Sequence, residues 1–151
     1  HFVLVKNEAG NGEIKLSWPV AVDTLVERPE KFNYKIDNDK DDNQQQWLID
    51  VYRLVEQSYG DPTFGTSAAA KLLYTSERNL QRKFKQITQR SFMEYVTEIR
   101  LEKACEMLIS GNKVANAAFE SGFNDPSYFS KRFKRHYGLS PTQFVSENEI
   151  L

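Results

Sequence analysis

The sequence predicts an all-α fold in which two helix-turn-helix subdomains are joined by a long linker helix. Two observations predict it: apolar residues recur with a helical period from Trp47 onward, and a helix–turn–helix pattern occurs twice. A short N-terminal extension, β-like or irregular, precedes the helical part. The chain has 151 residues, which corresponds to one domain or to one domain with an appendage.

Composition excludes several classes of protein. Hydrophobic residues make up 40% of the chain and aromatic residues 13%, which is enough apolar material for a packed core. The single cysteine, Cys105, excludes an intramolecular disulfide, and with only two histidines it also excludes a Cys/His zinc site. We expect no enzymatic activity, cofactor or metal, because no glycine-rich phosphate loop, nucleophile–base pair or ligand cluster is visible.

The first 46 residues are expected to be the tail of an upstream domain followed by an acidic linker. They carry a net charge of −3, whereas residues 47–151 carry +2. Residues 2–5 and 14–18 have the pattern of short strands on either side of an Asn-Gly turn signal. Residues 37–46 contain almost no apolar residue, which is typical of a solvated linker.

The helices from Trp47 onward can be placed by their start and stop signals. An apolar stripe at helical spacing predicts a first helix from Trp47, which Gly60 and Pro62 end. The first helix-turn-helix is expected over about residues 66–89. Ser76 is the expected N-cap of its second helix, because a serine side chain can accept a hydrogen bond from an unpaired amide of the first turn.

A linker helix is expected over about residues 92–110. Ser91 followed by Glu94 is a capping box that opens it, and Gly111 ends it. Such a helix of about 19 residues is about 28 Å long at 1.5 Å per residue. This length brings two recognition helices near the ~34 Å that separates successive major-groove faces of B-DNA, so one chain could read two adjacent grooves.

The second helix-turn-helix is expected over about residues 113–137. Asp125 before Pro126 is a strong start signal for its second helix, because the aspartate caps the helix and proline fits its first position. Ser140-Pro141 repeats this signal for a last short helix that carries Phe144.

The two motifs are copies of one pattern. In each, a short Ala-containing helix and a tight turn precede a basic helix with a phenylalanine, Phe84 or Phe133, on its buried face. A small residue at the same place, Ala70 or Ala118, lets the two helices cross closely. This is the form of a helix-turn-helix, whose second helix can enter a DNA major groove.

The linker helix and second motif also carry a long, ordered set of residues: Arg100-Leu101-Glu102-Lys103-Ala104, Leu108, Ala118, Gly122-Phe123, Asp125, Ser127-Tyr128-Phe129-Ser130, Arg132-Phe133-Lys134, Gly138, Ser140-Pro141 and Phe144. With this set, residues 47–146 resemble the C-terminal DNA-binding domain of the AraC/XylS family of bacterial transcription regulators. The resemblance implies a sequence-specific, cytoplasmic DNA-binding output domain that binds a bipartite site on double-stranded DNA.

By this resemblance, base-contacting positions fall on six residues of the two recognition helices: Arg78, Gln81, Arg82, Pro126, Ser127 and Lys131. Phosphate contacts are expected from the basic residues around them: Lys83, Lys85, Arg90, Arg132, Lys134 and Arg135. Pro126 has no side-chain donor, so we expect it to make only an apolar contact, for instance with a thymine methyl group.

The chain departs from the family pattern at two places. Tyr74 stands at the first turn, where the family usually has glycine, which predicts backbone strain or a changed turn angle. Phe144-Val145 stands where the family usually has Tyr-Arg, which removes one phosphate contact.

The expected partners of the full-length protein follow from the same resemblance. They are an upstream sensor or receiver domain, as in hybrid two-component regulators, and RNA polymerase. We expect no membrane contact from this segment, because no apolar run approaches the ~20 residues that span a bilayer. The alternative is a helical protein-interaction module that has lost its affinity for DNA. That alternative predicts weakly basic recognition faces, in contrast to Arg78, Arg82, Lys131 and Arg132.

Overall fold

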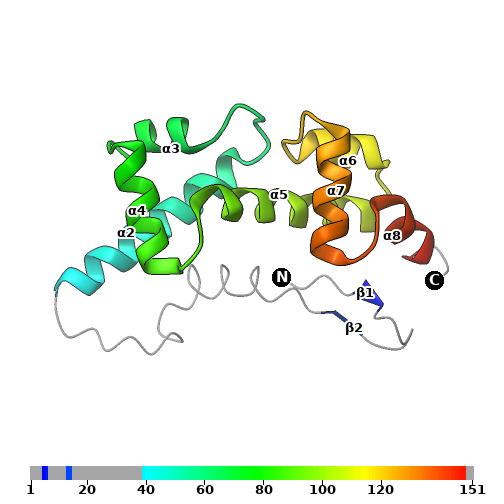
Figure 1. Cartoon of the computed structure of the whole chain (residues 1–151), viewed down its shortest axis with the longest axis horizontal. Coiled ribbons are helices and arrows are strands. Elements are labelled where there is room, and N and C mark those ends of the chain that lie inside the picture. Colours follow the sequence, from blue (N-terminus) through cyan, green and yellow to red (C-terminus); the bar gives the residue numbers. More distant parts are fainter. Residues whose placement is uncertain (1–4, 7–12, 15–38, 149–151) are drawn as a thin grey trace.

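The computed structural model of the chain describes residues 5–6, 13–14 and 39–148. Within these ranges it holds seven α-helices and one two-stranded ribbon, so the expected all-α fold is confirmed. Figure 1 shows two helical lobes near the two ends of the central helix α5 (Phe92–Ile109). In each lobe one helix stands roughly upright across α5, and the two upright helices are the second helices of the two motifs.

The N-terminal ribbon is short. β1 (Val5–Lys6) pairs antiparallel with β2 (Glu13–Ile14), and Val5 lies opposite Ile14. The strands expected at residues 2–5 and 14–18 therefore overlap with this ribbon at one residue each. Their other residues lie outside the described ranges.

Helix α2 (Asp39–Ser58) begins eight residues before Trp47. The interpretation of residues 39–46 as linker is therefore wrong, because these residues form the first two turns of a helix. Two physical reasons favour this: aspartates near a helix N-terminus interact favourably with its dipole, and glutamine is a good helix former. The side chain of Gln46 also donates to the Asp50 carboxylate at 3.0 Å, one turn further on.

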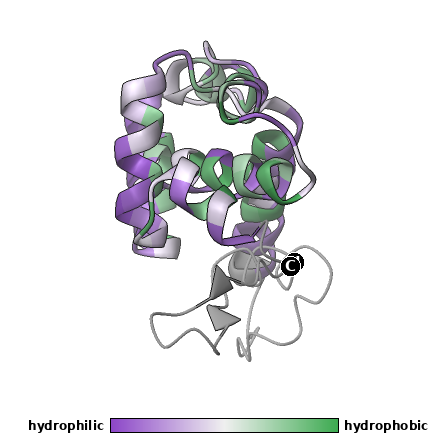
Figure 2. Ribbon diagram, turned by 90° about the vertical axis from the view of Figure 1, so that its right-hand side faces the viewer, coloured by the Kyte–Doolittle hydropathy of each residue, from purple (hydrophilic) through white to green (hydrophobic). Residues whose placement is uncertain are grey.

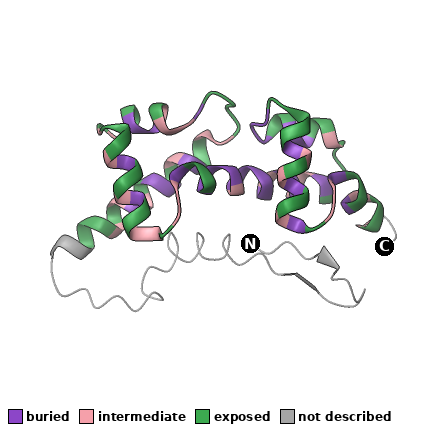
Figure 3. Cartoon of the chain, viewed as in Figure 1, coloured by how far each residue is buried: buried purple, intermediate pink, exposed green. Residues whose placement is uncertain are grey.

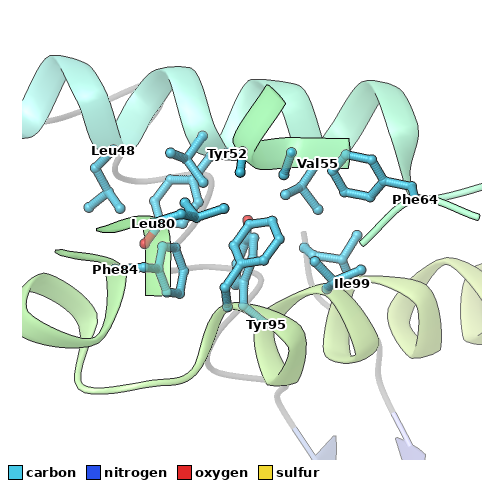
Figure 4. Packing of buried hydrophobic residues seen from close by; sticks show 13 residues of the cluster. Leu48, Tyr52, Val55, Phe64, Leu80, Phe84, Tyr95 and Ile99 are labelled. Atoms are coloured by element: carbon cyan, nitrogen blue, oxygen red, sulfur yellow. The ribbon is translucent and has the colours of Figure 1, made fainter. Parts of the chain in front are cut away.

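The first lobe packs α2 against the first motif and the start of α5. The motif consists of α3 (Thr66–Leu72) and α4 (Glu77–Thr88), and Ser76 caps α4 by accepting a hydrogen bond from the amide of Asn79 at 3.1 Å. Figure 4 shows the core of this lobe, where side chains of α2, α4 and α5 meet. Leu80 and Phe84 of α4 are fully buried there, so their face of the helix points away from solvent.

The second lobe repeats this arrangement with α6 (Val114–Glu120) and α7 (Pro126–Tyr137). Asp125 caps α7 by accepting hydrogen bonds from the amides of Ser127 and Tyr128, at 2.9 and 3.3 Å. Helix α8 (Pro141–Asn148) closes the lobe, and the rings of its Phe144 and of Phe133 lie 5.6 Å apart in the core.

Two separate apolar cores divide the molecule, and α5 contributes to both. The first core includes α5 residues up to Ile99, and the second begins at Leu101. Figure 3 shows α5 buried along most of its length, between the two lobes. Figure 2 shows hydrophobic residues gathered where helices meet and hydrophilic residues on the outward helix faces. The two motifs are therefore held by one helix but do not share a core.

The turns of the two motifs differ as expected from Tyr74. Tyr74 adopts φ 54°, in the left-handed region that disfavours a side chain, and Gly122 adopts φ 95° at the matching position of the second motif. Tyr74 is 97% exposed, so its side chain gains nothing from packing to offset this backbone conformation.

Candidate nucleic-acid interface

The exposed face of α4 carries the expected base-contacting residues of the first motif. Arg78, Gln81 and Arg82 are all exposed, on the side of the helix opposite buried Leu80 and Phe84. Together with Lys85 and the start of α5, these three residues line a groove of about 500 Å³. The structure therefore brings the predicted base readers of this motif together on one accessible surface.

Arg82 is already held along the surface of α4. Its guanidinium donates to the Asn79 side-chain oxygen at 2.7 Å and to the Gln86 side-chain oxygen at 3.2 Å. Both partners are uncharged, so the positive charge of Arg82 is not neutralised by them. A guanidinium offers five N–H donors, so others remain for a base edge or a phosphate.

The exposed face of α7 carries the corresponding residues of the second motif. Pro126, Ser127 and Lys131 are exposed, and so are Lys134 and Arg135. The opposite face buries three aromatic side chains, which form the core of this lobe: Phe129, Phe133 and Tyr137. The predicted readers of the second motif therefore also share one solvent-facing surface.

Three of the expected phosphate contacts lie away from these two faces. Lys83 places its ammonium group 4.4 Å from the centre of the Trp47 ring on α2. Arg90, in the turn between α4 and α5, forms an ion pair with Glu98. Arg132 is half-buried, and its Nε atom is buried. These three side chains face other parts of the protein, whereas Lys85, Lys134 and Arg135 face solvent.

A polar cluster lies between the two motifs, where Arg90 pairs with Glu98 of α5 and the charge of Arg132 acts on both Glu98 and His136. Burial raises the pKa of the Glu98 carboxyl, and the charges of Arg90 and Arg132 partly offset this effect. Burial lowers the pKa of His136, and the positive charges of Arg132 and Arg90 lower it further. The cluster therefore links the end of the first motif to the second recognition helix through charge.

Arg100 occupies the boundary between the two cores and had no predicted role. It is only 8% exposed, and its guanidinium donates to the backbone carbonyls of Tyr59 and Asp61 at 2.9 Å and of Phe64 at 3.0 Å. Burial lowers its pKa, and attraction to Asp61 partly offsets this effect. In the sequence, Arg100 stood out only as a charged residue in the middle of the expected linker helix and as part of the set that carries the family resemblance.

The part of the chain that the structure describes holds neither a cluster of metal-ligating residues nor a membrane-spanning helix. No group of three or more His, Cys, Asp or Glu residues converges there. Among the described helices, none combines the length and the apolar character that crossing a bilayer requires.

Comparisons with known proteins agree with this double motif. Residues 69–147 match the sequence model of a family described as a helix-turn-helix domain. The chain is 41% identical over 98 residues to a transcriptional regulatory protein, YesN, of Bacillus subtilis. The aligned segment covers 62% of this chain and 27% of YesN. It is also 29% identical over 101 residues to histidine kinase P4 of Formosa agariphila, and that aligned segment covers 66% of this chain and 7% of the kinase.

A solved structure shows the same fold. The C-terminal domain of the two-component response regulator yesN from Fusobacterium nucleatum superimposes with a TM-score of 0.61 at 31% identity, over 63% of this chain and 93% of that domain. The chain thus spans about a quarter or less of the full-length relatives above, and nearly the whole of this isolated domain. The chain therefore belongs to the helix-turn-helix domain family of the AraC type.

Proposed function

We propose that this domain reads a bipartite site on double-stranded DNA, with α4 in one major-groove segment and α7 in the next. The observation that carries the proposal is the pair of matching polar faces at the two ends of α5. Arg78, Gln81 and Arg82 form one face, and Pro126, Ser127 and Lys131 form the other. Side chains of this kind on a recognition helix discriminate base edges by hydrogen bonds and apolar contacts.

Phosphate contacts divide into two groups in this proposal. Lys85, Lys134 and Arg135 are exposed on or beside the two faces, so they would position the domain on the backbone without reading sequence. Lys83, Arg90 and Arg132 have protein partners or are half-buried, so a phosphate contact from them requires that they leave their present surroundings. We therefore expect the first group to account for most of the salt dependence of binding.

The regulatory context is proposed from the relatives. The yesN domain of known structure comes from a two-component response regulator, and histidine kinase P4 carries a similar segment. An upstream sensor or receiver domain would therefore control this domain, in a bacterial cytoplasm. RNA polymerase is the proposed partner through which DNA binding would change transcription. The division of the chain into an upstream tail and the DNA-binding domain stays part of this proposal, with its boundary moved from residue 46 to the start of α2 at Asp39.

The experiment that tests the proposal is a selection from random DNA with the 151-residue chain, followed by measurement of binding against salt concentration. We expect one enriched site with two half-sites about 10 base pairs apart, centre to centre. We also expect log K to fall linearly with log salt, with a slope of about −0.9 per phosphate contact. Absence of any enriched site would overturn the proposal and favour the helical protein-interaction module.

A further inference from the structure

The two motifs meet through polar and backbone contacts rather than through a shared core. The first core ends at Ile99 and the second begins at Leu101, so Arg100 is the residue between them. Helices curve gently, so α5, although it packs in both cores, leaves some freedom in the angle between the lobes. Contacts where the two lobes touch therefore add to α5 in fixing this angle.

Arg100 anchors the segment that connects α2 to α3. Its Nε donates to the Tyr59 carbonyl, and its terminal nitrogen donates to the carbonyls of Asp61 and Phe64. A buried guanidinium with three carbonyl acceptors is restricted in position, because moving it away would leave buried polar groups without hydrogen-bond partners. The segment from Tyr59 to Phe64 is thereby fixed on the surface of α5.

The same segment touches the second motif. A Cβ atom built on Gly122 would lie 2.1 Å from the Tyr59 carbonyl oxygen and 2.7 Å from Arg100 Nε. A Cβ atom built on Gly60 would lie 3.2 Å from the Glu120 carbonyl oxygen. The turn of the second motif therefore packs backbone to backbone against the segment that Arg100 holds, and no side chain fits between them.

We propose that Arg100 is a positioning residue that sets the angle and distance between the two recognition helices, and so sets the half-site spacing that the domain accepts. This inference rests on the proposed bipartite site. Arg100 would act through the Tyr59–Phe64 segment and the turn at Gly122, and it would not touch DNA. A change of one base pair in spacing moves one half-site by about 3.4 Å and rotates it by about 35° relative to the other.

Two substitutions disturb this contact from opposite sides, and each has a matched control. Arg100→Met removes the three hydrogen bonds from α5, and its control is Val96→Ala, which removes buried volume from the same helix within the first core. Gly122→Ala adds a Cβ atom that clashes with the Tyr59 carbonyl oxygen and Arg100 Nε from the side of the second motif. Its control is Gly111→Ala, because Gly111 has nearly the same backbone angle (φ 92° against 95°) and no atom within 4 Å of its added Cβ.

The experiment compares the affinity of the full chain for the selected site with its affinity for sites one base pair longer or shorter, and for each half-site alone. For the wild-type chain we expect each spacing change to weaken binding about tenfold, comparable with a mismatched base pair. For Arg100→Met and Gly122→Ala we expect this ratio to fall toward one, with half-site affinities unchanged. Val96→Ala and Gly111→Ala should keep the wild-type ratio.

A measurement without DNA separates this inference from the proposed function. ¹⁵N relaxation of the free wild-type chain should fit one rotational diffusion tensor for both lobes, whereas Arg100→Met and Gly122→Ala should require two. If Arg100→Met does not fold, Gly122→Ala decides both measurements. The inference is overturned if the variants keep the wild-type spacing ratio or tumble as one body. Failure of the wild-type chain to bind any bipartite site would instead overturn the proposed function.

Discussion

Truncation of Phe133 tests whether the second motif is held by the aromatic core seen in the structure. Its side chain is 0% exposed, and its ring lies 4.6 Å from that of Tyr137 and 5.6 Å from those of Phe129 and Phe144. Truncation of a fully buried phenylalanine to alanine costs about 3–5 kcal/mol. The three ring contacts, each worth about 0.5–1.5 kcal/mol beyond burial, place the expected cost of Phe133→Ala in the upper half of that range.

Urea unfolding of the full chain, followed by circular dichroism, measures this cost. The matched control is Phe119→Ala, because Phe119 is 68% exposed and its truncation should change the free energy of unfolding by less than about 0.5 kcal/mol. Hydrogen exchange should show the loss of protection first in α6, α7 and α8, because the first lobe has a core of its own. The reasoning is refuted if Phe133→Ala costs no more than Phe119→Ala.

Three further predictions concern DNA readout, the strained turn and the half-buried His136. Arg82→Ala should weaken binding to the selected site by about 1–3 kcal/mol and relax the preference at one or two base pairs, whereas Lys134→Ala should weaken binding to all sequences evenly; equal loss on selected and random DNA would exclude Arg82 as a reader. Tyr74→Gly should raise the free energy of unfolding by about 1 kcal/mol, because glycine adopts the left-handed conformation without the steric cost that a side chain adds; a decrease in the midpoint of urea unfolding would contradict this. The pKa of His136 lies below its ordinary 6.5 in the folded chain, so the unfolded chain binds the proton more readily. Stability should therefore be full above about pH 6.5 and decline as the pH falls through the lower, folded value, and His136→Gln should lose less stability than the wild-type chain between pH 7.5 and 5.5.

Helix starts could be predicted from the sequence where a local cap defines them. Ser76, Ser91 and Asp125 each accept a hydrogen bond from an amide of the helix that they were expected to open. These signals are local, since cap and amide lie within three residues of each other. The start of α2 was missed because residues 39–46 carry no apolar stripe, and a polar, charged composition of this kind also occurs in linkers.

The surroundings of individual basic residues could not be predicted from the sequence. Lys83 and Lys85 are two residues apart on α4, yet one faces the Trp47 ring and the other faces solvent. Arg90 meets a carboxylate that is eight residues further along the chain, across a turn whose angle no local pattern specifies. The same limit applies to Arg100, whose three acceptors lie 36–41 residues before it. Which face of a helix is basic follows from periodicity, but tertiary packing decides which charges remain free.

We propose that one chain reads two successive major-groove segments with two recognition helices. Hydroxyl-radical footprinting of the selected site, combined with the protein-to-DNA stoichiometry at saturation, tests this claim most directly. We predict two protected segments about one helical turn apart on one face of the duplex, with one chain bound per site. A single protected segment, or two chains per bipartite site, would contradict the claim.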